Sequence, residues 1–118
     1  MSSPDTDYLR HMLDEIRYLQ AQSTGLDAAA FQSDPTLRRA FVRNLEIIDE
    51  AAKHVSEPFR GCYPTIPWRA AGMRDRVIHD HLGVDYEIVW DVVRNKIPTL
   101  RIGLERILAA EDGSVSKS

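Results

Sequence analysis

The chain has 118 residues, one cysteine (Cys62), and 15 Lys and Arg against 18 Asp and Glu, a formal net charge of −3. This length suits one domain with a single core, and a lone cysteine excludes an intramolecular disulfide. The negative charge argues against a general attraction to nucleic acid, so any contact with RNA must be local. Because the chain has no membrane-length apolar run and no secretion signal in residues 1–7, we expect a cytoplasmic protein.

The N-terminal half of the chain has the spacing of amphipathic helices. Residues 3–22 should form the first, because Pro4 suits a first helical position, and Asp27 should cap a short second one. Asp34 should begin a long helix that ends before Pro58. The apolar positions that define the two longer helices are Leu9, Met12, Leu13, Ile16 and Leu19, followed by Leu37, Phe41, Leu45, Ile48, Ala52 and Val55.

Prolines and glycines divide the C-terminal half. Residues 57–66 contain three of them and show no period, which predicts a loop. Pro67 should restart a helix, Gly83 should end it as a left-handed cap, and Asp85 should cap the next helix. The apolar positions of that last helix are Ile88, Val89, Val92, Val93, Leu100, Leu104, Ile107 and Leu108.

These segments predict an all-α fold. Pro98 should kink or break the last helix, whose apolar pattern continues to about Ala110. We assign residues 1–111 to a single helical domain and residues 112–118 to a disordered tail. Since no segment alternates in polarity every two residues, we predict an up-and-down bundle of four main helices with one short extra helix.

The segment that ends at His81 carries the pattern most informative about function. Arg74 is separated from His79 by four residues, and Arg76 is separated from His81 by the same number. A guanidinium is a permanently charged phosphate ligand and an imidazole titrates near neutrality, so this pair suits RNA cleavage that needs no metal. Asp75 lies four residues before His79 and could orient its imidazole.

The surroundings of this pattern resemble the HepT-like (DUF86) branch of the HEPN superfamily. The segments that carry the resemblance are Ile66-Pro67-Trp68, Gly72-Met73-Arg74-Asp75, His79-Asp80 and Gly83-Val84-Asp85-Tyr86-Glu87-Ile88-Val89-Trp90. Residues 43–53 are similar to the family's long second helix, in which many members have glycine at the place of Asp49. A further departure is His81, which stands where characterised members have a tyrosine that a partner nucleotidyltransferase modifies with adenylate.

The resemblance implies a metal-independent endoribonuclease that acts as the toxin of a HepT/MNT-type toxin–antitoxin pair. It implies a homodimer with the motifs facing a shared groove, a minimal nucleotidyltransferase (MNT) as the antitoxin, and RNA as the substrate. It also selects Arg74 and His79 as the catalytic pair, because the Gly-Met-Arg-Asp sequence aligns on Arg74. Arg74 would stabilise charge on the scissile phosphate and His79 would transfer protons, with a 2′,3′-cyclic phosphate as product. No cofactor is expected.

Two alternatives remain open at this point. The chain could be a non-catalytic, nucleotide-binding or scaffold partner of the same nucleotidyltransferase. The histidines could also bind a metal, but His79 and His81 would point about 200° apart on a helix, which makes joint coordination unfavourable. His11 and His54 are expected to be ordinary structural or solvated residues.

A helical geometry for the motif leads to a conflict. On an ideal helix Arg74 and His79 point about 140° apart, and Arg74 lies on the apolar arc. A partly buried Arg74 would need a carboxylate partner, for which Glu46 or Glu50 is a candidate. The pair can converge if the helix loosens near its end or if two subunits build the site together, and we favour the dimer.

The remaining candidates surround the motif. The window from residue 60 to residue 76 contains four arginines and one acid, a local charge of +3. We keep Arg69 and Arg76 as possible contacts to RNA phosphates. Trp68 and Trp90 could stack on bases, but such residues more often serve as packing anchors.

Overall fold

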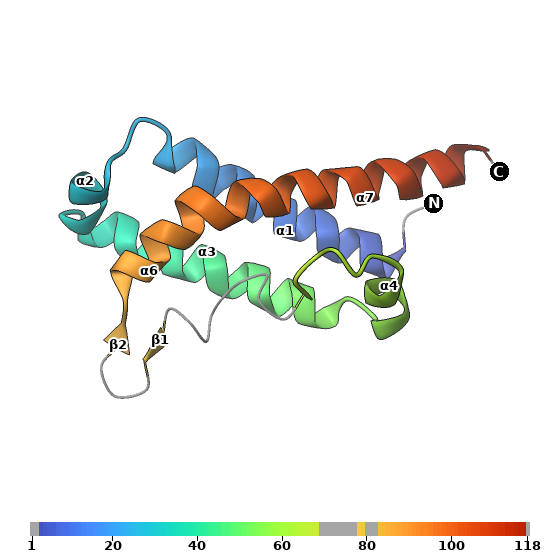
Figure 1. Cartoon of the computed structure of the whole chain (residues 1–118), viewed down its shortest axis with the longest axis horizontal. Helices are drawn as coiled ribbons and strands as arrows, with labels where there is room; N and C mark the ends of the chain where they lie inside the picture. The colour runs from blue at the N-terminus through green and yellow to red at the C-terminus, as the bar shows by residue number, and fades with distance from the viewer. Residues whose placement is uncertain (1–2, 69–77, 80–82, 118) are drawn as a thin grey trace.

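The computed structural model describes residues 3–68, 78–79 and 83–117. Three long helices form its body, namely α1 (Pro4–Ser23), α3 (Pro35–His54) and α7 (Ile97–Lys117). Helix α1 contacts both α3 and α7, and the three extend along the long axis of the molecule (Figure 1). The described residues are almost entirely helical, which confirms the all-α prediction. In this part of the chain, no helix combines the length and apolar character needed to cross a membrane.

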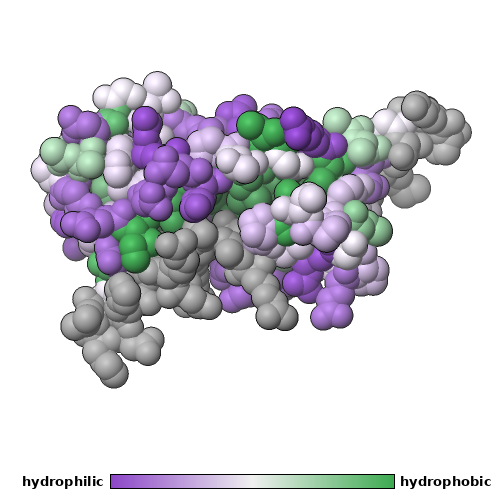
Figure 2. All heavy atoms as spheres, in the orientation of Figure 1, coloured by the Kyte–Doolittle hydropathy of each residue, from purple (hydrophilic) through white to green (hydrophobic). Residues whose placement is uncertain are grey.

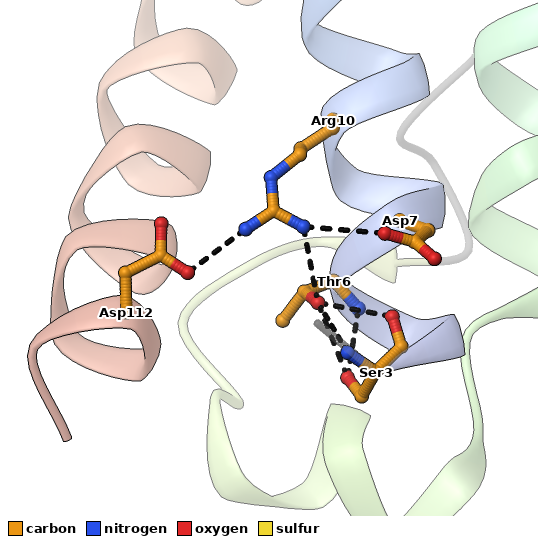
Figure 3. A network of polar contacts seen from close by, with 5 residues as sticks. All are labelled: Ser3, Thr6, Asp7, Arg10 and Asp112. Carbon is orange, nitrogen blue, oxygen red and sulfur yellow. Dashed lines mark hydrogen bonds and ion pairs between the residues drawn. The ribbon is translucent and has the colours of Figure 1, made fainter. Parts of the chain in front are cut away.

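Helix α1 begins at the predicted position because its first turn is capped reciprocally. The Thr6 amide donates to Ser3 Oγ at 3.2 Å, and the Ser3 amide donates to Thr6 Oγ1 at 3.0 Å. The Arg10 guanidinium extends this network, donating to Asp7 Oδ1 at 3.2 Å and to Asp112 Oδ1 at 2.8 Å (Figure 3). The start of α1 is therefore bound to the C-terminal part of α7.

Helix α7 is longer than the sequence pattern predicted. The apolar pattern stops near Ala110 and residues 112–118 were expected to form a disordered tail, whereas the backbone of α7 is helical to Lys117. The apolar pattern stops earlier since the residues that follow make polar contacts. Glu111 accepts a hydrogen bond from Tyr63, and Asp112 accepts one from Arg10. A helix can therefore continue beyond its apolar stripe when its polar side chains find partners in neighbouring elements.

The core lies between α1, α3 and the C-terminal helices. Every apolar position named above is buried except Leu37, Ile88 and Leu108, which are partly buried against the same core. Helix α2 (Ala28–Gln32) begins after its predicted cap Asp27 and inserts Phe31 into this core. The Phe31 ring stacks on Phe41 at 5.1 Å and on Trp90 at 5.2 Å between ring centroids. Trp90 is thus a packing residue, as expected.

Helix α4 (Glu57–Cys62) corrects the prediction that residues 57–66 form a loop throughout. Ser56 caps this helix by accepting from the Phe59 amide at 3.3 Å, and Pro58 lies in its first turn. The Ser56 amide and hydroxyl also donate to the two Asp5 carboxylate oxygens at 2.7 and 2.8 Å. Six residues are too few to show a period, and the contact with Asp5 comes from the start of α1.

Pro98 does not break the C-terminal helix. Helix α6 (Tyr86–Asp91) continues into the π-helix η2 (Val92–Lys96) and then into α7. Proline lacks an amide hydrogen and its ring clashes with the carbonyl four residues earlier. The backbone accommodates the proline with a wider π turn, in which the Ile97 amide donates to the Val92 carbonyl five residues back. The predicted disturbance at Pro98 is therefore a π turn within a continuous helix.

Candidate active site

His79 lies on a short β-strand. Strand β1 (Ile78–His79) pairs antiparallel with β2 (Gly83–Val84), and His79 lies opposite Gly83. The prediction of a helix from Pro67 to Gly83 is therefore wrong at its C-terminal end. Gly83 does adopt a left-handed conformation, with φ of 84°, but within a hairpin. The same backbone conformation suits a helix cap and a hairpin, so glycine alone could not distinguish them.

This hairpin changes the geometric argument about the motif. The angle of about 140° between Arg74 and His79 assumed one straight helix through both residues. A strand at His79 removes that assumption for the histidine. The other predicted motif residues lie outside the described part of the chain, and these are Arg69, Arg74, Asp75, Arg76 and His81.

Asp85 fixes the hairpin to the body of the fold. Directly after β2, its Oδ1 accepts from the Glu87 amide at 3.0 Å and from the Ile88 amide at 3.2 Å, which confirms it as the cap of α6. Helix α6 contacts α2 and α3. The hairpin that carries His79 is therefore attached to one end of the bundle (Figure 1).

Replacement of the α6 cap should destabilise the protein measurably. We expect Asp85→Ala to lower the free energy of unfolding by about 1 kcal/mol, because two amides of the first turn lose their acceptor. Urea unfolding followed by circular dichroism measures this change. The matched control is Asp14→Ala, since Asp14 is exposed and lies 3.9 Å from its cation Arg17, and it should change stability by less than about 0.5 kcal/mol. Equal losses in both variants would contradict the capping role.

The chain that leads into the motif is attached to α7. The Trp68 indole Nε1 donates to the Tyr63 carbonyl at 3.1 Å, and the Trp68 ring is partly buried against the core. Ile66 is buried beside Gly103, where a Cβ atom would come within 2.5 Å of Ile66 Cδ1. The Tyr63 hydroxyl donates to Glu111. Trp68 thus serves as a packing anchor at the start of the motif segment, in agreement with the expectation for tryptophan.

The contact between Tyr63 and Glu111 should make stability depend on alkaline pH. The hydrogen bond that the Tyr63 hydroxyl donates to Glu111 raises the pKa of Tyr63 to about 12. Burial of the hydroxyl and the negative charge of Glu111 act in the same direction. A raised pKa in the folded state means that the stabilisation is complete below the unfolded pKa of 10.0 and is lost as the pH rises toward about 12. We expect Tyr63→Phe to cost about 1 kcal/mol at neutral pH.

Chemical denaturation at neutral and alkaline pH tests this expectation. The difference in unfolding free energy between wild type and Tyr63→Phe should shrink above pH 10, because the wild type loses the hydrogen bond that the variant already lacks. Tyr18→Phe is the control, since Tyr18 is 41% exposed. A Tyr63 difference that stays constant with pH would contradict the coupling to Glu111.

Glu46 and Glu50, the two candidate partners of Arg74, line a cavity of about 560 Å³ on the surface formed by α1 and α3. Glu46 is partly buried and Glu50 is exposed. Glu50 Oε1 lies 3.5 Å from His54 Nε2, and the His54 ring stacks on Tyr8 at 5.2 Å. Among the side chains that the structure describes, no three His, Cys, Asp or Glu residues lie close enough together to hold a metal ion.

Asp49 is a carboxylate that the sequence analysis noted without assigning it a role. Its side chain is 7% exposed, whereas that of Glu50 is 65% exposed. The Lys53 ammonium approaches Asp49 Oδ2 to 3.1 Å from the solvent side. Asp49 is therefore a carboxylate shielded from water, in contrast to Glu50. The sequence signal that could have predicted the burial of Asp49 is its position between the apolar residues Ile48 and Ala52.

Comparison with known proteins identifies the family. Residues 12–107 match the family model described as "Ribonuclease HepT-like". The chain belongs to this family. The matched range of the HepT-like chain extends from α1 to α7 and includes both Arg74 and His79, so the resemblance seen in the sequence is confirmed.

Relatives of this HepT-like protein carry similar descriptions. The chain is 43% identical over 105 residues to a protein of Caldanaerobacter subterraneus named "Putative RNase", covering 88% of this chain and 94% of that protein. It is 35% identical to a Methanocaldococcus jannaschii protein with the same description, covering 95% and 90% of the two chains. A Thermococcus cleftensis protein named "Probable ribonuclease HepT" is 34% identical, with 91% and 98% covered. No solved structure matches the chain.

Proposed function

We propose that the protein is an endoribonuclease that cleaves RNA without a metal ion, using Arg74 and His79. The observation that carries this proposal is the family match over residues 12–107, which spans the motif and the helices that support it. The names of the relatives, which describe ribonucleases, agree with it. The anchoring of the motif segment at Trp68 and at Asp85 is consistent with a site that must hold a fixed geometry.

The chemistry follows from the two side chains. His79 acts as the proton-transfer group, accepting the proton of the ribose 2′-hydroxyl or supplying one to the leaving 5′-oxygen. The 2′-oxygen attacks the phosphorus as the bond from phosphorus to the 5′-oxygen breaks, which leaves a 2′,3′-cyclic phosphate on one fragment and a 5′-hydroxyl on the other. Arg74 stabilises the negative charge that develops on the phosphate oxygens, with Asp75 orienting the imidazole and His81 as a supporting residue.

The complete site is proposed to form in a homodimer. Two copies related by a two-fold axis would each bring one motif to a shared groove, so that the arginine of one subunit can serve the histidine of the other. The second copy would double the local positive charge of residues 60–76. Arg69 and Arg76 of both subunits would contact RNA phosphates along the groove. Sedimentation measurements at several protein concentrations test the assembly.

The biological role proposed is that of the cytoplasmic toxin in a HepT/MNT-type pair, neutralised by a minimal nucleotidyltransferase. Because His81 stands where characterised members have the modified tyrosine, neutralisation would act by occlusion or at another hydroxyl. Tyr86 follows the motif, but its ring is covered by the Arg38 guanidinium at 4.8 Å, which favours a packing role.

Purified protein incubated with RNA in the presence of EDTA tests the activity. We expect fragments that end in 2′,3′-cyclic phosphate from the wild type and none from Arg74→Ala. Expression without the nucleotidyltransferase should arrest growth, and co-expression should restore it. A protein that binds the nucleotidyltransferase but neither cleaves RNA nor arrests growth would instead support the non-catalytic scaffold.

A further inference from the structure

A second cavity lies beside the chain that leads into the motif. It has a volume of about 410 Å³, within the range of about 300–1,000 Å³ typical of sites for small ligands. One wall is the connection after α4, and the other is the face of η2 and α7 that the connection crosses. Figure 2 shows hydrophobic residues exposed along the middle of the face that carries α7, between hydrophilic ones. The residues that matter to its chemistry are Ile66, Asn95, Lys96, Thr99, Ile102 and Arg106.

The charged side chains that line this cavity in the described part of the chain, Lys96 and Arg106, are both positive. No Asp or Glu is among its described lining residues. Within the same part, neither cation has an ion-pair partner, whereas Arg10, Arg17 and Arg101 each pair with an acid. The cavity on α1 and α3 differs, because Glu46 and Glu50 lie there beside a single arginine. The cavity lined by Lys96 and Arg106 therefore suits an anion, in a protein whose net charge is −3.

The floor of the cavity is apolar. Ile66 and Leu100 are buried beneath it, and Ile102 is 52% exposed at its edge. Thr99 and Asn95 add a hydroxyl and an amide that can donate and accept hydrogen bonds. An apolar surface with a few polar groups and cations at the rim matches the parts of a nucleotide, namely a flat base and a charged phosphate.

Two features of the backbone shape this cavity. Gly103 allows Ile66 to approach α7, since a Cβ atom there would lie 2.5 Å from Ile66 Cδ1. The π-helix η2 ends with Asn95 and Lys96, both of which line the cavity, and π turns are frequent at functional sites. The opposite wall ends at Pro67, from which the chain enters the motif segment that contains Arg74.

We propose that this cavity binds one unpaired nucleotide of the RNA substrate. The base packs on Ile66 and Ile102, and Lys96 and Arg106 contact the phosphates on either side of it. A base within a duplex is stacked and paired on both sides, so only single-stranded RNA can supply it. This inference rests on the proposed ribonuclease function and adds to it a class of substrate and a specificity site.

Binding measurements on a variant that cannot cleave RNA test the proposal directly. In the His79→Ala background, a labelled single-stranded oligoribonucleotide of mixed sequence should bind more tightly than a hairpin duplex. Lys96→Ala and Arg106→Ala should each weaken single-strand binding about tenfold and make its salt dependence shallower by about one unit of slope. Arg39→Ala is the matched control, since Arg39 is an exposed cation of α3 that does not line the cavity.

Filling the cavity gives a second readout that leaves the charge unchanged. Thr99→Trp places a large ring in the cavity from an exposed position, and Ala109→Trp places the same ring elsewhere on α7. We expect Thr99→Trp to raise KM for RNA about tenfold or more with little change in kcat, and Ala109→Trp to leave both unchanged. Unaltered binding and KM in the Lys96, Arg106 and Thr99 variants would overturn the proposal.

The outcomes separate this inference from the function on which it rests. Cleavage that depends on His79 but is insensitive to the cavity variants overturns the nucleotide site alone. RNA binding that depends on the cavity, without cleavage by the wild type, overturns the ribonuclease function and leaves an RNA-binding site. If Thr99→Trp converts a dimer into monomers in sedimentation experiments, the surface is an interface between copies, and the nucleotide proposal is wrong.

Discussion

His79→Ala should reduce RNA cleavage by about 10²- to 10⁴-fold, with little change in KM, because general acid–base catalysis by a positioned side chain contributes about that factor. The loss should fall on kcat, since His79 is proposed to move a proton and the binding of RNA is assigned to cations. Single-turnover cleavage of an end-labelled RNA measures the step without interference from product release.

The control for this variant is His54→Ala. His54 is a solvent-exposed histidine that lies on α3 with its ring against Tyr8. Its replacement removes an imidazole from the same protein and leaves the residues of the motif unchanged, so cleavage should stay within about twofold of wild type. If both variants retain wild-type rates, His79 has no role in proton transfer and the assignment of the motif fails.

The helix starts were predictable because their signals are local. Asp27 and Asp85 each cap the helix that the sequence assigned to them, and the helices expected to begin near Pro4 and Asp34 are capped by Ser3 and Asp34. A cap is a short side chain that bonds to amides two or three residues later, so the sequence contains the whole interaction. The apolar spacing likewise identified the buried face of each long helix.

The elements that were missed depend on distant contacts. Helix α4 is bound by Asp5 through Ser56, which lies 51 residues further along the chain. Strand β1 exists because β2 pairs with it, and two-residue strands leave no alternation in the sequence. The extension of α7 follows from its partners Tyr63 and Arg10. Local propensity does not report such contacts. At α4, at β1 and at the end of α7, tertiary contacts determined the secondary structure against the local sequence pattern.

The candidate site residues are a prediction from the sequence, and the helical geometry predicted for His79 was wrong. The motif and the family resemblance selected Arg74 and His79, but a helical wheel was the wrong frame for His79. The buried carboxylate of Asp49 and the cavity beside Lys96 were not predicted either. Both depend on which side chains come together in three dimensions. The sequence contains these residues but does not show which of them are neighbours in the fold.

Phe31→Ala should cause the largest loss of stability, about 3–5 kcal/mol in the free energy of unfolding. Phe31 is fully buried, and its ring lies against Phe41 of α3 and Trp90 of α6 at centroid distances of 5.1 and 5.2 Å. Truncation to alanine removes apolar contact area and the ring stacking together, and it leaves a cavity where three elements meet. Urea unfolding followed by tryptophan fluorescence reports the change, since Trp90 is one of the stacked rings.

Phe59→Ala is the matched control, because Phe59 is only partly buried and its ring lies against the ring of Tyr63 at 5.1 Å between centroids. It should cost about 1–2 kcal/mol, in proportion to the smaller apolar area that it buries. The comparison also bears on function. Phe31 supports α6, and α6 begins two residues after the hairpin that carries His79. Partial unfolding at this end of the bundle would release the hairpin, so cleavage by Phe31→Ala should fail at lower urea than cleavage by Phe59→Ala. If both lose activity at the same urea concentration, the hairpin does not depend on the packing around Phe31.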